Sequence, residues 1–139
     1  MRRAIVDTDV LTIGFLDARG GAARVVDAWL AGHFVLCCAS AQLSEVAAVL
    51  KRAELAAYAE PMRVEQFLFD LERRSERLTR MRLIEGVEDP ASRALLGLAV
   101  AAEVDVLVVG EGSAFRDFPV LGEVKVRTAR EFAVRLAAS

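Results

Sequence analysis

The stretch Ala4-Ile5-Val6-Asp7-Thr8-Asp9-Val10-Leu11 decides the fold of this chain. A short apolar run ends in a carboxylate, a hydroxyl and a second carboxylate, and apolar residues then resume. A buried parallel strand that delivers acids at its carboxyl end has this pattern. Because ligands of open α/β sheets bind just beyond the carboxyl ends of the strands, the stretch predicts a functional site around Asp7 and Asp9.

The composition predicts one domain over residues 1–139, long enough to bury a substantial core. The chain is 55% hydrophobic with a mean hydropathy of +0.35, which favours an apolar surface used for self-association. The formal net charge of −2 gives no overall positive field. Binding of nucleic acid would therefore need a local basic patch or bound metal ions.

Cysteine usage and hydropathy predict a cytoplasmic protein. Cys37 and Cys38 are adjacent within an apolar run, so we interpret both as small core residues in a reducing compartment. The first apolar run stops at Asp7, too early for a signal peptide. Glu103 and Asp105 interrupt the longest apolar stretch, so no membrane span is expected.

Strands and helices alternate along the chain. Buried strands are expected at residues 3–7, 34–39 and 104–109, an edge strand at 78–84 and a short last strand at 124–127. Helices are expected at residues 10–16, 22–31, 40–52, 54–59, 61–74, 91–102 and 129–138, and irregular structure at 115–122. This order predicts an α/β fold with three layers, α/β/α, around a central parallel sheet of about five strands.

Two helix starts carry cap signals. Ser40 lies where the hydroxyl of an N-cap residue would accept a bond from the first turn. Thr128 and Glu131 have the spacing of a capping box at the start of the last helix.

Carboxylates recur at the predicted strand ends and helix starts, which meet at one edge of a parallel sheet. They are Asp7, Asp9, Glu45, Glu88, Asp89 and Glu111. Clustered carboxylates repel one another unless a divalent cation lies among them, and oxygen ligands without His or Cys favour Mg²⁺ or Mn²⁺. Such a cation can activate water and stabilise the leaving oxygen of a phosphodiester. The alternative is that these acids merely cap helices and complement their dipoles.

The ordered set of motifs resembles the PIN-domain nucleases across nearly the whole chain. Asp7-Thr8-Asp9 matches their opening turn, and Glu45 lies in a Leu-Ser-Glu-Val context on the second-acid helix. Glu88-Asp89-Pro90 precedes a Leu/Ala-rich helix, as in the toxin-like branch, and residues 126–132 resemble the closing strand, turn and helix. The resemblance implies a Rossmann-like parallel sheet and a metal-dependent ribonuclease, often the toxin of a toxin–antitoxin pair and often dimeric.

The resemblance implies a site of four acids, of which Asp7 and Glu45 match the first two. At the third position, the start of the long helix, this chain has Ser92 and Arg93. The positive charge of Arg93 competes with a metal ion and could pair with Asp7 or Glu111 instead.

The fourth acid of the family follows the next strand, where this chain reads Gly110-Glu111-Gly112-Ser113 in place of Gly-Asp-x-Asp. Glu111 can still ligate through its longer side chain, whereas Ser113 offers only a hydroxyl. Asp89, on the turn before the long helix, is a substitute for the third acid.

Two hypotheses for function remain open. In the first, Asp7, Glu45 and Glu111 hold Mg²⁺ or Mn²⁺, with help from Asp9 or Asp89, and the protein cleaves single-stranded RNA by metal-activated water. The residues expected to line this site are Thr8, Ser92, Arg93 and Ser113. In the second, the ion is lost because Arg93 occupies its place, and a degenerate PIN domain binds RNA or a protein without cutting. A receiver or flavodoxin type of domain is disfavoured because the second buried strand ends in Ala39-Ser40, without an acid.

One basic concentration stands out, formed by Arg73, Arg74, Arg77, Arg80 and Arg82. It is either a solvated face or a contact surface for RNA phosphates or for an acidic antitoxin segment. The second interpretation singles out Arg80 and Arg82 as the contacts.

Overall fold

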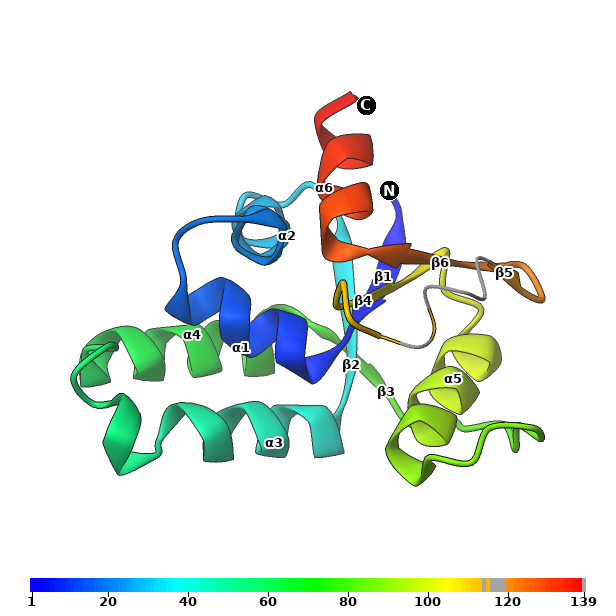
Figure 1. The fold of residues 1–139 in the computed structure, drawn as a ribbon, viewed down its shortest axis with the longest axis horizontal. Helices are drawn as coiled ribbons and strands as arrows, with labels where there is room; N and C mark the ends of the chain where they lie inside the picture. Colours follow the sequence, from blue (N-terminus) through cyan, green and yellow to red (C-terminus); the bar gives the residue numbers. More distant parts are fainter. Residues whose placement is uncertain (114, 116–119, 139) are drawn as a thin grey trace.

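The computed structural model describes residues 1–113, 115 and 120–138. Figure 1 shows α1 to α4 on one side of a central sheet and α5 on the other. The strands are β1 (Arg3–Val6), β2 (Val35–Ala39), β3 (Glu76–Leu78), β4 (Val106–Val109), β5 (Val120–Leu121) and β6 (Val124–Thr128). The helices are α1 (Thr8–Leu16), α2 (Gly21–Leu30), α3 (Ser40–Leu50), the 3₁₀ turn η1 (Ala53–Leu55), α4 (Pro61–Arg74), α5 (Pro90–Ala102) and α6 (Ala129–Ala138).

The strand order of the sheet is β3-β2-β1-β4-β6-β5. The first five of these are parallel to one another, which confirms the expected three-layer fold, and the two-residue β5 runs antiparallel to β6. The chain moves outward from β1 to β2 and β3, and then crosses to the other side of β1 to form β4. The point between β1 and β4 is therefore the topological switch point, where open α/β sheets bind their ligands.

Both faces of the sheet are buried, which explains the continuous apolar runs of its strands. Ala4 and Val6 of β1 belong to the core shared with α1, α2, α3, α4 and α6. Ile5, which points the opposite way, belongs to a second core under α5. Burial on both faces holds β1 at the centre of the molecule and leaves the next residue, Asp7, at the edge of the sheet.

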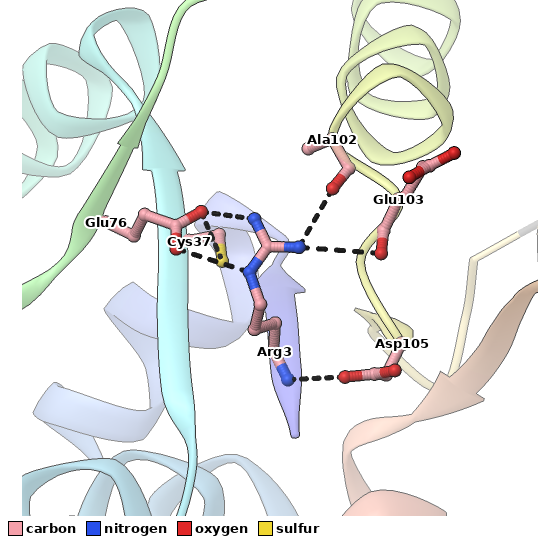
Figure 2. Close-up of polar contacts among 6 residues, drawn as sticks. All are labelled: Arg3, Cys37, Glu76, Ala102, Glu103 and Asp105. Carbon is pink, nitrogen blue, oxygen red and sulfur yellow. Dashed lines mark hydrogen bonds and ion pairs between the residues drawn. The ribbon is translucent and has the colours of Figure 1, made fainter. Parts of the chain in front are cut away.

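At the amino edge of the sheet, Arg3 joins β1 to β3, to the end of α5 and to the loop before β4 (Figure 2). Its guanidinium forms an ion pair with Glu76 on β3 and donates to the carbonyl oxygen of Ala102 at the end of α5, at 2.9 Å. Its backbone N–H donates to Asp105 Oδ2, before β4, at 2.8 Å. The Sγ of Cys37 on β2 donates to Glu76 Oε2 at 3.6 Å. These contacts fix the edge opposite to Asp7.

Both cysteines are buried in the core, as expected. Burial raises the pKa of Cys37 to about 11 and that of Cys38 to about 12. Both thiols are therefore protonated and unreactive at neutral pH.

The prediction of an edge strand at residues 78–84 is wrong, because β3 is Glu76–Leu78 and the chain then runs irregularly to α5. After β3, the backbone of Arg82 bonds to a helix instead of a neighbouring strand: its N–H donates to the carbonyl oxygen of Gly97 on α5, at 3.1 Å. A Cβ at Gly97 would lie 2.3 Å from the carbonyl oxygen of Arg82, so glycine permits this close approach.

Three smaller expectations are also corrected. Residues 54–59 form no full helix, only the 3₁₀ turn η1. Val120 and Leu121, expected to be irregular, pair with β6 across a turn in which Gly122 has φ 61°; residues 114 and 116–119 of the same expected segment lie outside the described residues. Ser40 is the first helical residue of α3 rather than its N-cap, which is Ala39.

The capping box of α6 is confirmed. The backbone N–H of Glu131 donates to Thr128 Oγ1 at 3.2 Å, and the backbone N–H of Thr128 donates to Glu131 Oε1 at 2.9 Å. Within the described residues, no helix has the length and apolar character that a membrane crossing requires.

Candidate functional site

Asp7 lies at the carboxyl end of β1, beside the switch point. Its backbone N–H donates to the carbonyl oxygen of Val108 on β4 at 2.9 Å, so the backbone of Asp7 still belongs to the sheet. Its side chain has already turned to the next element, because Asp7 is the N-cap of α1 and Oδ1 accepts from the N–H of Asp9 at 3.5 Å. The half-buried carboxylate is thereby held on the sheet edge.

Neighbouring negative charges act on Asp7. Burial raises the pKa of its carboxyl group, and the charges of Asp9 and Glu45 raise it further, against hydrogen bonds from two backbone N–H groups that lower it. In the folded chain, Asp9 and Glu45 are therefore close enough for their negative charges to act on the carboxyl group of Asp7. A cation among them would relieve the repulsion, and their hard oxygen donors suit Mg²⁺ or Mn²⁺.

Glu45 reaches this region on α3, where its side chain is exposed. The start of α3 is fastened to the sheet by Gln42, a buried side chain that bonds the backbone of both β1 and β2. The sequence analysis missed Gln42. Its signal was present, because Gln42, Val46 and Leu50 follow one another at helical spacing and all three are buried.

Glu111 follows the end of β4 by two residues, so the topology places it on the other side of the switch point from Asp7. The turn that carries it is closed by the N–H of Ser113, which donates to the carbonyl oxygen of Gly110 at 3.1 Å. The hydroxyl of Ser113 accepts from the N–H of Phe115 at 3.1 Å, so it stabilises the turn.

Asp89 is the N-cap of α5. Its Oδ2 accepts from the N–H of Ser92 at 3.0 Å and from the hydroxyl of Ser92 at 2.6 Å. These two bonds, with a smaller effect of the Arg93 charge, lower the pKa of the Asp89 carboxyl group. The guanidinium of Arg93 donates to the carbonyl oxygen of Glu88 at 3.5 Å. Ser92, Arg93 and Asp89 therefore stabilise one another at the start of α5.

Across the part of the chain that the structure describes, no three His, Cys, Asp or Glu side chains form a group that could hold a metal ion. The charges of Asp9 and Glu45 act on Asp7, and Glu111 follows the end of the neighbouring strand, but side chains must still move for all four acids to share an ion. The donor chemistry fits a divalent cation, and the coordination set is not preassembled.

The surface cavities described lie elsewhere. One of about 950 Å³ is lined by residues of α2 and α6, including Arg24, Asp27 and Leu136, and contains none of the predicted site residues.

The five arginines of the basic concentration make different contacts in the structure. Arg73 lies over the ring of Phe69 at 5.6 Å, and Arg74 lies over the ring of Trp29 at 5.3 Å. Arg77 donates to Ser40 Oγ at 3.0 Å and pairs with Glu72 at 3.2 Å. The remaining two, Arg80 and Arg82, lie on the irregular segment before α5 with exposed side chains.

A family model described as PIN domain matches residues 3–112 of the chain. The match begins at β1 and ends in the turn after β4, so it includes Asp7, Glu45, Asp89 and Glu111. No curated protein matches the chain.

Proposed function

The chain belongs to the PIN-domain family, whose members are generally nuclease modules that use divalent metal ions, and from this we propose that it is a metal-dependent endoribonuclease of toxin–antitoxin type. Its substrate in this proposal is single-stranded RNA. One observation carries the proposal: Asp7 lies at the switch point with its pKa raised by burial and by the charges of Asp9 and Glu45. Such charge crowding is typical of sites that bind a cation or transfer a proton.

In this proposal Asp7, Glu45 and Glu111 hold Mg²⁺ or Mn²⁺, with Asp9 and Asp89 assisting. When bound, the ion would supply an activated water and would stabilise the leaving oxygen of the phosphodiester. Asp7 must lose its proton to ligate, so metal affinity falls as the pH falls toward the pKa of Asp7. The hydroxyls of Thr8, Ser92 and Ser113 line the site.

Arg93 bears on whether the ion is retained. Its guanidinium is bound to the carbonyl oxygen of Glu88 and lies beside Asp89, and no ion pair joins it to Asp7 within the described part of the chain. This supports a site in which the Asp7 carboxylate is left available for a cation.

The second candidate function is a degenerate PIN domain that binds RNA or a protein without cleaving. Two observations favour it: the acids of the described residues are not preassembled, and the Asp89 carboxylate is engaged by Ser92. The two candidates differ in metal binding, which makes that the first property to measure.

We further propose a cytoplasmic protein that forms homodimers and binds an antitoxin. The solvent face of α4 supports a protein partner, because the side chains of Met62 and Phe69 there are 77% and 55% exposed. The two buried, protonated thiols support a reducing compartment.

The proposal is tested by titrating Mn²⁺ and Mg²⁺ into the protein in a calorimeter, beside Asp7→Asn and the exposed control Asp17→Asn. We expect binding by the parent and by Asp17→Asn, and none by Asp7→Asn. Cleavage of single-stranded RNA should then require the metal and Asp7. A parent that binds RNA but neither binds Mn²⁺ nor cleaves would establish the degenerate domain instead.

A further inference from the structure

Three polar residues are buried in the described part of the chain, and Gln42 differs from the other two. Thr12 bonds the carbonyl oxygens of Thr8 and Asp9 within its own helix. Thr128 caps the helix that it precedes. The side chain of Gln42, 5% exposed, instead joins two strands and the helix that follows them.

The geometry of Gln42 is that of an amide inserted between two strands. Its Nε2 donates to the carbonyl oxygen of Val6 at 3.0 Å, and its Oε1 accepts from the N–H of Ala39 at 3.2 Å. The paired register of β1 and β2 ends at Ile5 and Cys37. One step further, the Ala39 donor and the Val6 acceptor would bond directly in a continuing parallel ladder. The side-chain amide stands between them and separates the two strand ends.

We propose that Gln42 is a positioning residue of the acidic site, which sets the separation of Asp7 and Glu45. Val6 directly precedes Asp7, and Ala39 directly precedes α3, on which Glu45 follows Gln42 by three residues. The amide therefore connects the backbone that carries one acid to the helix that carries the other. The expected effect of Gln42 on metal affinity rests on the proposed function. Its effect on the separation of Asp7 and Glu45 does not, because that separation can be measured without metal.

The chemistry of the position selects glutamine. A methionine has the same length but can neither donate to Val6 nor accept from Ala39, so both buried backbone groups would lose their partner. A glutamate can accept from Ala39, but its second oxygen must carry a proton to donate to Val6. Burial favours that protonated form, so glutamate should replace glutamine at low pH and fail at high pH.

The first experiment measures the separation in the metal-free protein. Nitroxide labels are attached to cysteines introduced by Asp9→Cys and Ser44→Cys, both at exposed positions, while the buried Cys37 and Cys38 resist labelling. The distance distribution between the labels is compared in the parent, in Gln42→Met and in Gln66→Met. Gln66 is the matched control, because its amide bonds only Asp70 of its own helix among the described residues, at 3.3 Å.

We expect a narrow distribution in the parent and in Gln66→Met, and a broader or displaced one in Gln42→Met. If Gln42→Met fails to fold, Gln42→Glu provides the test instead. Its distribution of distances between the labels should match that of the parent at pH 5.5 and broaden at pH 8. Leu71→Ala, a cavity variant in the core under α4, should lose stability without changing the distribution. An unchanged distribution in folded Gln42→Met, or in Gln42→Glu at both pH values, would overturn the inference.

The second experiment measures the Kd of Mn²⁺ in the same variants without labels. We expect Gln42→Met to weaken binding by about 10- to 100-fold, as for other groups that hold a metal ligand in place, and Leu71→Ala to leave it unchanged. If the parent itself binds no Mn²⁺, the proposed nuclease fails while the distance measurement still decides the role of Gln42. Normal Mn²⁺ affinity together with unchanged distances in Gln42→Met would refute that role.

Discussion

Arg3 on β1 and Glu76 on β3 form an ion pair that spans the intervening strand β2, at the sheet edge opposite to the candidate site (Figure 2). The two residues are 73 positions apart in the sequence. The same guanidinium bonds the carbonyl oxygen of Ala102, so it also complements the dipole at the carboxyl end of α5.

Substitution of Arg3 should therefore lower the free energy of unfolding by a different amount than substitution of Glu76. Glu76→Gln should lower the free energy of unfolding by about 0.5–1 kcal/mol, because the pair is partly exposed. Arg3→Met should cost about 1–2 kcal/mol, because it also leaves Ala102 without its donor. Urea denaturation at pH 7 measures both, with the exposed Glu54→Gln as a control that changes nothing. Equal costs for the two variants would show that the bond to α5 contributes little.

The same pair predicts a pH dependence. The hydrogen bond from Arg3 lowers the pKa of Glu76 in the folded protein. The stability it contributes is therefore complete above the pKa of an unfolded glutamate and is lost as the pH falls through the folded pKa. Unfolding curves of the parent and Glu76→Gln should converge in acid.

Asp7 should show the opposite behaviour in the metal-free protein. Its folded pKa is raised, so its ionisation opposes folding, and this cost grows as the pH rises through the folded pKa. Asp7→Asn retains an N-cap side chain and should be more stable than the parent at pH 8 by on the order of 1 kcal/mol. Thermal unfolding across pH 4 to 8 measures this difference, which should shrink in acid.

Addition of Mn²⁺ should reverse that order. If the ion binds only the folded parent, it stabilises the parent by mass action and leaves Asp7→Asn unaffected. An Asp7→Asn protein less stable than the metal-free parent at pH 8 would mean that the carboxylate serves mainly as a helix cap.

The substitution Gly97→Ala tests whether the close packing of Arg82 against α5 contributes to stability. Alanine is the better helix former, yet its Cβ would lie 2.3 Å from the carbonyl oxygen of Arg82. The free energy of unfolding of the variant should fall by about 1–3 kcal/mol, as it does when a side chain is forced into a filled site. Gly112→Ala, whose Cβ would meet none of the described residues within 4 Å, is the control. A stabilised Gly97→Ala would show that the segment moves away from α5 without cost.

Arg80 and Arg82 are predicted to contact RNA phosphates. Charge reversal by Arg80→Glu or Arg82→Glu should weaken binding of single-stranded RNA at low salt, and each should reduce the slope of log K against log salt by about 0.7. Arg24→Glu, exposed on α2 beside the cavity at the other edge, is the control. Fluorescence anisotropy measures the affinities. Unchanged affinity in both variants would leave these arginines as a solvated face.

The element order could be predicted because it depends on local patterns. The apolar runs of β1, β2 and β4 and the capping box of Thr128 and Glu131 specify their own conformations through burial and short-range hydrogen bonds. The expected strand at residues 78–84 failed because its alternating pattern was outweighed by a tertiary contact, the close approach of Arg82 to Gly97. Periodicity in the sequence carries no information about such a contact.

The sequence alone determined the alternation of strands and helices, the burial of the central strands and the acids that follow them, since these depend on hydrophobic periodicity and on chain order. Only the tertiary structure decided the strand order, which places Asp7 and Glu111 on either side of the switch point, because pairing between distant strands depends on packing. It also decided the role of Gln42, whose two backbone partners lie on different strands. A buried amide must find its partners wherever the fold places them, so its function becomes visible only once the chain is folded.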